Sequence, residues 1–537
     1  MMMTGAKAIV KMLEAEGVTT IFGYPGAGNA PLYDALLESN IKHILPRGEQ
    51  AAAHEANGYA RTSGKVGVCT ATSGPGATNL ITGIATAYMD SIPMVAITGQ
   101  VPVHMIGQDA FQEVDIVGAT EPITKHNYLV KNAADIPRII KEAFYIAKTG
   151  RPGPVLIDVP MDVAKTEIDF KQPGAVEIRG YKPTIKGSPL QIKKFLAALA
   201  TAKKPVIVAG GGIASAGAEA KMREFIQKTK IPVVTTLMGI TSAPNYGDYW
   251  LGMIGLHGCL PANHAVGEAD LLIAIGVRFN DRTVAKHKDR EGLTVVHIDI
   301  DPAEIGKSIP AHIPIVGDVK TILGQILTEL PEGNESAWTK ELLALKKDPG
   351  YEQKEGYVNP KYAMKILSYL TQGNATVVTE VGQNQIWAAN GYKASQKGAF
   401  ITSGGFGTMG FGLPAAIGAK IGDPVRTVIA IEGDGSFQMS LAELATMRQW
   451  NVPLKIILFR NDWLGMVREY QKNNFGSRYH GVDISGSPDF VALSEVYGIR
   501  GERISSNAEV EAALSRMLAD DESYFVEFVV DKDEPTL

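Results

Sequence analysis

The stretch TVIAIEGDGSFQMSLAELATMRQWNVPLKIILFRNDWLG, residues 427–465, decides the fold. Residues 427–431 form a short apolar run of strand length, and the GDG turn at 433–435 breaks it. Residues 436–450 then carry apolar side chains at helical spacing, and a second apolar run ends at the polar turn NDWLG. The pattern predicts a strand, a tight turn, a helix and a second, parallel strand.

The GDG turn is a candidate anion site, because a helix start offers free N–H groups and a favourable dipole to a phosphate. Asp434 places a carboxylate there, which implies Mg²⁺ or a similar hard cation between the two negative groups. Asn461 follows 27 residues later, at the end of the next strand, and is the expected second ligand. A GDG turn alone is usually an ordinary tight turn. In this setting it resembles the metal and diphosphate motif of thiamine-diphosphate enzymes.

Length and composition limit the class of protein. A chain of 537 residues is too long for one core and suggests three domains. The net charge of −5 comes without a basic stripe, so nucleic acid is not an expected partner. Cys69 and Cys259 are far apart in apolar or Gly-rich settings, which favours buried fillers in a reducing cytoplasm over a disulfide. No apolar run reaches the roughly 18 residues of a membrane span, and the first residues resemble an amphipathic helix.

Strand and helix patterns alternate through most of the chain. Such alternation predicts α/β domains with doubly wound parallel sheets, here over residues 1–165, 190–335 and 359–537. SGPGATN at 73–79 is interpreted as a Gly-rich turn, and 166–190 and 332–358 as linkers, the second with a short helix.

Glu49 begins a predicted helix in the first domain. An acid in a first helical turn is ordinarily explained by the helix dipole. The functional interpretation needs thiamine diphosphate, whose aminopyrimidine ring is activated by a hydrogen bond from a carboxylic acid. Burial would let such an acid share a proton at neutral pH.

A resemblance to one known family extends over nearly the whole chain. The sequence is similar to the catalytic subunit of the acetohydroxyacid synthase (acetolactate synthase) family. The motifs that carry the similarity are SGPGATN at 73–79, GQVPVHMIGQDAFQE at 99–113, ITKHNYLV at 123–130, TGRPGPVLIDVP at 149–160, GVRFNDR at 276–282, HIDIDPAEIGK at 297–307 and GFGTMGFGLPAAIGA at 405–419.

The resemblance implies thiamine diphosphate, Mg²⁺ and FAD as cofactors, bound by an N-terminal pyrimidine-binding, a central FAD-binding and a C-terminal diphosphate-binding domain. Glu49 would contact the aminopyrimidine, and Met409 would hold the cofactor in a bent shape. The metal ligands would be Asp434, Asn461 and Trp463. The other positions matching thiamine-diphosphate contacts are Val381, Gly382, Gln383, Asn384, Gly407, Gly435, Ser436, Leu464, Gly465 and Met466.

The local sequence pattern gives less support to the implied FAD site than to the metal turn. GGG at 210–212 is not GxGxxG, and by itself it indicates a close strand-to-helix crossing. Arg278 and Arg282 suit phosphates and carboxylates, because guanidinium groups bind both in a bidentate manner. In the family the flavin takes no part in the net chemistry. The full set implied by the resemblance is Arg151, Gly210, Gly211, Gly212, Thr236, Leu237, Met238, Gly255, His257, Gly276, Arg278, Asp281, Arg282, Asp299, Ile300 and Asp318.

The implied reaction is a transfer. Pyruvate loses CO₂, and the hydroxyethyl unit passes to pyruvate or 2-ketobutyrate in isoleucine and valine biosynthesis. The catalytic residues would be Glu49, Gln112 and Lys125, and the substrate would meet Phe111, Gln112, Lys125, Arg282 and Tyr470. The family also implies a homodimer or homotetramer with interfacial active sites, and a small regulatory subunit as a partner.

Several positions depart from the usual family form. Tyr470 stands where Trp is typical, and that Trp favours 2-ketobutyrate as acceptor, so acceptor preference is open. Ala27, Gly48 and Asn384 replace a glycine and two histidines near the cofactor. The sequence ends at DKDEPTL, before the tail that closes over the site in relatives.

Three alternative functions share parts of this sequence pattern. A pyruvate oxidase-type oxidoreductase shares the architecture but uses FAD for electron transfer, and the FNDR and DAFQE motifs count against it. A glyoxylate carboligase would lack the acid at Glu49. A cofactor-binding protein without turnover would not need Glu49, Asp434 and Asn461 together.

Overall fold

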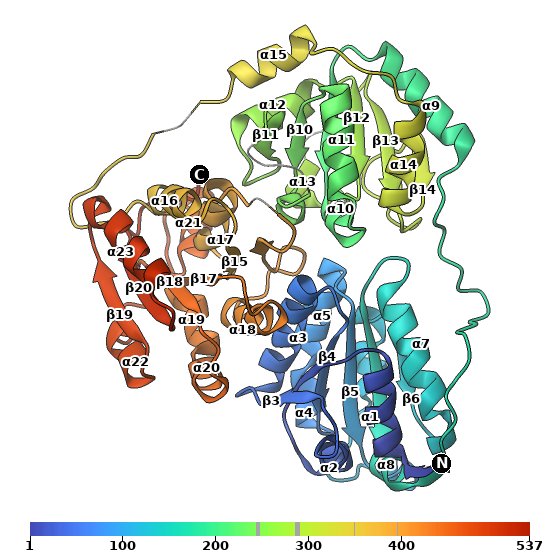
Figure 1. Cartoon of the computed structure of the whole chain (residues 1–537). Helices are drawn as coiled ribbons and strands as arrows, with labels where there is room; N and C mark the ends of the chain where they lie inside the picture. Colours follow the sequence, from blue (N-terminus) through green and yellow to red (C-terminus); the bar gives the residue numbers. More distant parts are fainter. Residues whose placement is uncertain (243–246, 285–289, 348–349, 395) are drawn as a thin grey trace.

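The computed structural model describes residues 1–242, 247–284, 290–347, 350–394 and 396–537. Within these residues the chain forms three six-stranded parallel sheets, each built from a separate stretch of sequence (Figure 1). Each sheet has a hydrophobic cluster on both faces. In the first sheet, for example, Val68 belongs to one cluster and its neighbour Cys69 to the other. The prediction of three doubly wound α/β domains is confirmed, and the boundaries given above stay predictions.

The first sheet has the strand order β3-β2-β4-β5-β7-β6. Its strands are β2 (Thr20–Gly23), β3 (Lys42–Ile44), β4 (Gly67–Ala71), β5 (Met94–Gln100), β6 (His126–Leu129) and β7 (Pro154–Pro160). Its helices are α1 (Gly5–Ala15), α2 (Ala30–Leu36), α3 (Glu49–Ser63), α4 (Pro75–Asn79), α5 (Ile81–Asp90), α6 (Ile116–Thr120), α7 (Ile136–Lys148) and α8 (Met161–Lys165). The SGPGATN turn is therefore shorter than predicted, because Pro75, favourable in a first helical turn, begins α4.

The second sheet has the order β11-β10-β9-β12-β13-β14. Its strands are β9 (Pro205–Ala209), β10 (Val233–Thr235), β11 (Trp250–Met253), β12 (Leu271–Ile275), β13 (Thr294–Asp299) and β14 (Ile313–Val316). The helices are α9 (Pro189–Thr201), α10 (Gly211–Ser215), α11 (Glu219–Thr229), α12 (Leu260–Glu268), α13 (Asp281–Val284), α14 (Val319–Glu329) and, in the second predicted linker, α15 (Ala337–Ala344).

The third sheet has the order β16-β15-β17-β18-β20-β19. Its strands are β15 (Thr376–Thr379), β16 (Phe400–Ile401), β17 (Val428–Gly433), β18 (Lys455–Arg460), β19 (Arg500–Ile504) and β20 (Tyr524–Val529). The helices are α16 (Pro360–Thr371), α17 (Gln383–Gly391), α18 (Gly412–Gly422), α19 (Asp434–Ser440), α20 (Leu444–Trp450), α21 (Gly465–Asn474), α22 (Phe490–Val496) and α23 (Asn507–Ala519). The single helix predicted at 436–450 is divided, because Ser440 leaves helical backbone geometry.

The first and third domains meet through α3 and α18, which lie side by side in Figure 1. A Cβ atom at Gly58 would lie 1.9 Å from the Ala415 carbonyl oxygen, and one at Gly418 would lie 1.8 Å from that of Glu55. Side chains do not fit at either position, so the two helix backbones touch directly. This contact fixes where α3, and Glu49 at its start, stand relative to the third sheet.

The first predicted linker is not wholly irregular. β8 (Glu167–Asp169) pairs antiparallel with β1 (Met2–Thr4), a short ribbon that the sequence pattern did not predict. Both cysteines are free, as expected. Among the described helices, none is long and apolar enough to cross a membrane.

Candidate active site

Asp434 lies where β17 ends and α19 begins. β18 runs parallel beside β17, so the turn after β18 comes to the same edge of the sheet. There the Asp434 Oδ2 atom accepts the backbone N–H groups of Asn461 at 3.0 Å and Asp462 at 2.6 Å. Burial raises the pKa of Asp434 to about 7, and these N–H groups act against that shift. The two predicted ligand residues are therefore adjacent.

The Asn461 side chain is held from two sides. Its Oδ1 atom accepts the Trp463 N–H at 3.0 Å, and its Nδ2 atom donates to Gln383 Oε1 at 3.3 Å. Gln383, at the start of α17, donates in turn to the Glu534 carbonyl at 3.1 Å. The side-chain amide of Gln383 thus joins the turn after β18 to the segment that contains Glu534. The predicted cofactor residues of the 381–384 and 461–465 turns therefore lie together.

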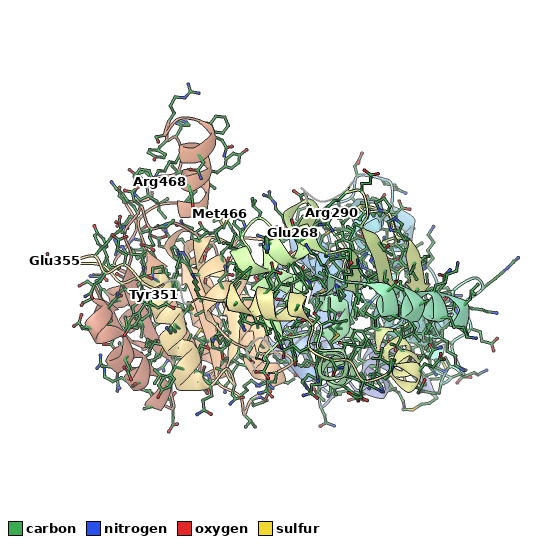
Figure 2. All side chains as sticks on the ribbon, turned by 90° about the horizontal axis from the view of Figure 1, so that it is seen from above. Glu268, Arg290, Tyr351, Glu355, Met466 and Arg468 are labelled. Atoms are coloured by element: carbon green, nitrogen blue, oxygen red, sulfur yellow. The ribbon has the colours of Figure 1, made fainter. Side chains whose placement is uncertain are left out.

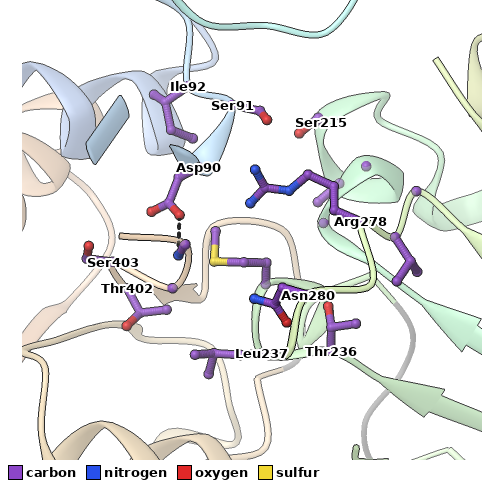
Figure 3. A pocket seen from close by; sticks show the side chains of 18 of the residues that line it. Asp90, Ser91, Ile92, Ser215, Thr236, Leu237, Arg278, Asn280, Thr402 and Ser403 are labelled. Atoms are coloured by element: carbon purple, nitrogen blue, oxygen red, sulfur yellow. Dashed lines mark hydrogen bonds between the residues drawn. The ribbon is translucent and has the colours of Figure 1, made fainter. Parts of the chain in front are cut away.

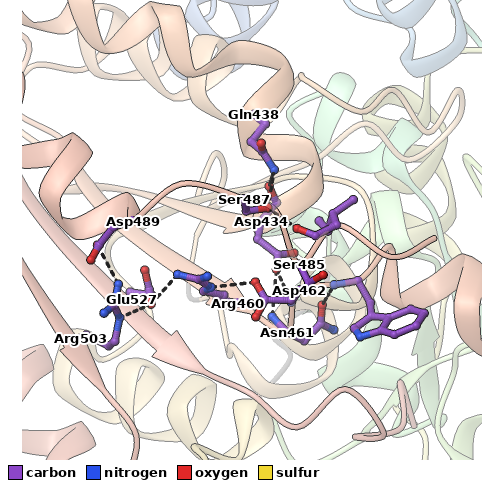
Figure 4. A network of polar contacts seen from close by, with 12 residues as sticks. Asp434, Gln438, Arg460, Asn461, Asp462, Ser485, Ser487, Asp489, Arg503 and Glu527 are labelled. Carbon is purple, nitrogen blue, oxygen red and sulfur yellow. Dashed lines mark hydrogen bonds and ion pairs between the residues drawn. The ribbon is translucent and has the colours of Figure 1, made fainter. Parts of the chain in front are cut away.

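Behind this turn runs an ion-pair network that the sequence did not predict (Figure 4). Asp462 has a left-handed φ of 61°, and its carboxylate accepts Arg460 Nε at 2.9 Å. Arg460 also lies 3.7 Å from Glu527, which pairs with Arg503 at 2.5 Å; Arg503 reaches Asp489 at 2.7 Å. The network stabilises the left-handed backbone conformation of Asp462, in which its N–H group donates to Asp434. Arg460 and Asp462, the two oppositely charged residues that flank Asn461, were the sequence signal for this network.

Two buried carboxyl groups stand beside the turn and also escaped the sequence analysis. Glu380 accepts the N–H groups of Gly410 at 3.1 Å and Gly412 at 2.7 Å, and so holds the segment that carries Met409. Burial raises the pKa of Glu380 to about 7 and places that of Glu432 well above its ordinary value, with Glu380 adding to the second shift. Glu380 directly follows β15 and Glu432 directly precedes the GDG turn, but no motif position in the sequence analysis assigned either residue to a metal or cofactor.

Glu49 is the first residue of α3 and is half-buried. Its Oε2 atom accepts Asn79 Nδ2 at 3.0 Å. Among the described residues, no hydrogen bond or ion pair joins Glu49 to the Asp434 turn. The two halves of the predicted thiamine site are thus each formed in the chain, but no polar contact links them.

The other predicted catalytic and substrate residues are separated. Phe111 is 88% exposed, and Gln112 has a φ of 58° in the same loop. Lys125 instead donates to the carbonyl groups of Ile146 and Thr149. Burial and the Arg151 guanidinium lower the pKa of Lys125 to about 8, against the effect of Asp301. The structure gives Lys125 partners that the sequence did not predict.

A cavity of about 1790 Å³ opens where the three domains meet (Figure 3). Figure 3 shows Arg278 extending from the second domain toward Asp90 of the first. Asp90 accepts the Gly405 N–H at 2.7 Å and pairs with Arg61 at 2.7 Å, so one carboxylate joins the first and third domains at the cavity wall. Among the described residues the Arg278 side chain has no hydrogen bond or ion pair, and burial, then Arg151, lowers its pKa.

Most of the predicted FAD set lines this cavity. The lining members are Arg151, Gly211, Gly212, Thr236, Leu237, Met238, His257, Gly276, Arg278, Asp281, Arg282, Asp299, Ile300 and Asp318. Gly210 and Gly255 do not line it. A Cβ atom at Gly210 would lie 2.0 Å from the Gly276 carbonyl oxygen, so Gly210 serves the close strand-to-helix crossing. Gly255 likewise packs against the Arg282 backbone.

The cavity also touches part of the predicted thiamine and substrate sets, namely Val381, Gly407, Met466 and Tyr470. Met466 and Tyr470 belong to α21, which stands out from the rest of the chain in Figure 2. Tyr470 is 59% exposed and packs edge-on against Phe475. Arg282 is also largely exposed, beside Asp281. The rim of the cavity therefore carries two of the residues predicted to meet substrate, Arg282 and Tyr470, whereas Phe111, Gln112 and Lys125 do not line it.

Comparisons with known proteins identify the family of the chain. Three models of thiamine pyrophosphate enzymes match the chain: the N-terminal TPP binding domain over residues 3–119, the central domain over 192–326 and the C-terminal TPP binding domain over 380–528.

Whole-chain relatives narrow the family. The probable acetolactate synthase large subunit of Methanocaldococcus jannaschii is 48% identical, over 99% of this chain and 93% of its own. The acetolactate synthase large subunits of Haemophilus influenzae and Lactococcus lactis are each 44% identical over 99% of this chain, and over 95% and 94% of their own. The chain therefore belongs to the thiamine pyrophosphate enzymes and, within them, to the family of acetolactate synthase large subunits.

Proposed function

We propose that this protein is an acetolactate synthase that decarboxylates pyruvate and transfers the hydroxyethyl unit to a second 2-ketoacid. One observation carries the proposal. The whole-chain similarity to acetolactate synthase large subunits coincides with a buried Asp434 joined to Asn461 at one sheet edge. The pyruvate oxidase-type alternative has no such support.

We assign the metal to the oxygen atoms of Asp434 and Asn461 and to the Trp463 carbonyl. The donor set fits Mg²⁺, which prefers carboxylate, amide and carbonyl oxygens. Thiamine diphosphate, when bound, supplies an electron sink for the pair of electrons that CO₂ leaves behind. The turns at 381–384, 407–409 and 464–466 would hold its diphosphate and orient its rings, and Gly435 and Ser436 border the metal turn.

Glu49 is assigned to share a proton with the aminopyrimidine ring. Asn79 donates to Oε2 at 3.0 Å and orients the carboxyl group while leaving Oε1 without a hydrogen-bond donor among the described residues. Glu49 is the first residue of α3, so the helix start fixes the position of its carboxyl group. Gln112 is assigned to the substrate.

FAD is assigned to the three-domain cavity. Its volume of about 1790 Å³ exceeds the roughly 300–1,000 Å³ of pockets for drug-sized ligands and suits a dinucleotide. Arg278 is a desolvated cation without a protein partner among the described residues, which supports an anionic ligand such as a diphosphate.

The active site is assigned to the interface of a homodimer, because in each chain the Glu49 half and the Asp434 half are formed without a polar contact between them in the part of the chain that the structure describes. A second copy would complete both sites. The names of the relatives as large subunits support a small regulatory subunit as partner. A cytoplasmic location remains part of the proposal.

Product analysis tests the reaction. The protein is incubated with pyruvate, with and without thiamine diphosphate, Mg²⁺ and FAD. Acetolactate that depends on thiamine diphosphate and Mg²⁺ supports the proposal. Acetate or acetyl phosphate accompanied by flavin bleaching would establish the oxidase instead.

Mixing two inactive variants tests the interfacial site. Glu49→Gln and Asp434→Asn chains are each expected to be inactive alone. Random exchange of subunits forms mixed dimers with one intact site, so about a quarter of the wild-type activity should return. No recovery after verified exchange would place the complete site within one chain.

A further inference from the structure

Lys125, predicted to meet substrate, instead directs all its donors to groups of its own chain. It precedes β6, and its ammonium donates to the Ile146 carbonyl, to the Thr149 carbonyl at 2.7 Å and to the Tyr181 hydroxyl at 3.2 Å. An ammonium has three N–H donors, so none is left. Within this chain Lys125 acts on the protein itself.

The two carbonyl groups belong to the end of α7 and its C-cap residue. The last carbonyls of a helix have no partner inside the helix, and a cation placed there satisfies them and complements the dipole. Lys125 therefore sets the course of the chain as it leaves α7 at Thr149.

Tyr181 ties a second segment to the same point. It lies between β8 and α9, in the stretch that connects the first and second domains. Its hydroxyl donates to the Thr149 carbonyl at 2.8 Å, and its ring packs edge-on against Tyr145. The connecting stretch is thereby fastened to the end of α7 through Thr149 and Lys125.

Arg151, two residues after Thr149, bridges the two domains. Its Nε atom donates to Ser91 Oγ at 2.9 Å in the first domain. Its Nη1 atom donates to Glu304 at 2.8 Å and lies 3.3 Å from Asp301 in the second domain. Arg151, Ser91, Glu304 and Tyr181 all line the three-domain cavity.

We propose that Lys125 and Tyr181 are positioning residues that fix the Thr149–Arg151 turn, and with it the relative placement of the first and second domains around the cavity. Lys125 then affects how tightly the cavity binds FAD rather than the chemical step. This inference rests on the proposed function for the identity of the ligand.

The chain contains a matched control in Lys141. Lys141 lies on α7, the helix whose end Lys125 contacts, and its ammonium donates to the carbonyl groups of Pro173 at 3.0 Å and Gly174 at 2.7 Å. It thus fastens the same connecting stretch with the same chemistry. Neither Pro173 nor Gly174 lines the cavity.

The test compares Lys125→Met, Tyr181→Phe and Lys141→Met in the full-length protein. FAD affinity is measured by flavin fluorescence, and kcat is measured at saturating FAD with thiamine diphosphate and Mg²⁺. The Kd for FAD should rise about tenfold in Lys125→Met and less in Tyr181→Phe, with kcat at saturating FAD within about twofold of wild type. Lys141→Met should match wild type in both. A lower kcat with an unchanged Kd in Lys125→Met would overturn the proposal and restore a catalytic lysine.

Hydrogen exchange provides a measurement that does not depend on flavin. The amides of Thr149 and Gly153 donate to the carbonyl groups of Tyr145 and Ala147, so they report on this turn. Without FAD, they should exchange faster in Lys125→Met and Tyr181→Phe than in Lys141→Met. Unchanged exchange in both would refute the positioning role, even if the wild-type protein failed to bind FAD. Failure of the wild type to bind FAD would refute only the proposed ligand. If Lys125→Met does not fold, Tyr181→Phe decides.

Discussion

Arg460 and Arg278 are both half-buried guanidinium groups, yet they stand in opposite surroundings. Arg460, beside the Asp434 turn, pairs with Asp462 and faces Glu527. Arg278, in the wall of the three-domain cavity, has no such partner among the described residues. The first region is complete within one domain and holds its polar groups in place before any ligand arrives. The second places a partly desolvated cation near the carboxylates of Asp90, Glu304 and Asp299 without a direct ion pair among the described residues, which leaves its hydrogen-bond donors available to an anionic ligand.

The largest expected effect comes from removing the carboxylate at the centre of the first region. Asp434→Asn keeps an oxygen that accepts the N–H groups of Asn461 and Asp462, so the turn should persist, but the charge that attracts Mg²⁺ is lost. Activity should fall by about 10³-fold or more, since a metal site supplies several kcal/mol to catalysis. The measurement is Mg²⁺-dependent binding of thiamine diphosphate together with kcat.

Asp423→Asn is the control, because Asp423 pairs with Arg426 in the connection between α18 and the start of β17, at the opposite end of that strand from Asp434. This variant should bind cofactor normally. Tight Mg²⁺ binding by Asp434→Asn would show that the Asp434 turn is not the metal site.

Glu49→Gln should separate chemistry from cofactor binding. The amide oxygen of Gln can still accept Asn79 Nδ2, so α3 should begin normally. Loss of the shared proton should lower kcat by about 10²-fold or more, the usual scale for acid–base catalysis, while Mg²⁺ binding stays as in wild type. Turnover close to wild type in this variant would exclude the assigned role of Glu49.

The Asp434 turn could be predicted from the local sequence pattern, and the three-domain cavity could not, for a physical reason. Asp434 and Asn461 end consecutive parallel strands, so their proximity follows from the strand and helix pattern alone. The cavity forms only when three separately folded domains pack, and residues as distant as Asp90, Arg278 and Gly405 meet there by tertiary packing alone. No local pattern encodes that meeting, and only the family resemblance pointed to it.

The same limit explains the smaller failures. β1 and β8 have three residues each, too few for a periodic signal. The partners of Lys125 include two backbone carbonyl groups, which leave no trace in the sequence. The buried faces of the three sheets were predictable, because strands covered on both sides are continuously apolar.

Arg278→Gln removes the cation from the cavity wall and should affect ligand binding without affecting stability. Loss of a charge-assisted contact to the flavin diphosphate should raise the Kd for FAD by about 10- to 100-fold. Thermal stability without FAD should not fall, because the side chain has no protein partner among the described residues to lose. Flavin fluorescence and a melting curve measure both quantities.

Lys148→Gln is the control, an exposed cation on the same rim that pairs with Glu16. A clear loss of stability in Arg278→Gln would show that this arginine supports the fold after all.

Arg460→Met should show the opposite behaviour. Glu527 has no exposed side-chain surface and would keep only Arg503, and Asp462 would lose its partner. The free energy of unfolding of the third domain should fall by about 1–3 kcal/mol. FAD affinity should stay unchanged. Denaturant unfolding of Arg500→Met, which breaks an exposed pair with Asp520, gives the baseline and should differ from wild type by less than about 1 kcal/mol.

Tyr470→Trp tests the rim of the cavity and should have the smallest effect. Tyr470 lies on α21 and is 59% exposed, so a larger indole ring can be accepted without disturbing a packed core. The added apolar surface should favour 2-ketobutyrate over pyruvate as acceptor by a few-fold, below the roughly tenfold or more that one methylene group contributes in a fitted pocket. Competition between the two acceptors, with product ratios as the readout, measures the change.

Phe475→Trp enlarges the ring that packs against Tyr470 and is the matched control. If both variants shift the product ratio equally, acceptor choice depends on how α21 packs as a whole. If only Tyr470→Trp shifts it, the residue at position 470 itself meets the acceptor. An unchanged ratio in Tyr470→Trp would mean that the acceptor is selected deeper in the cavity, where the walls come from all three domains.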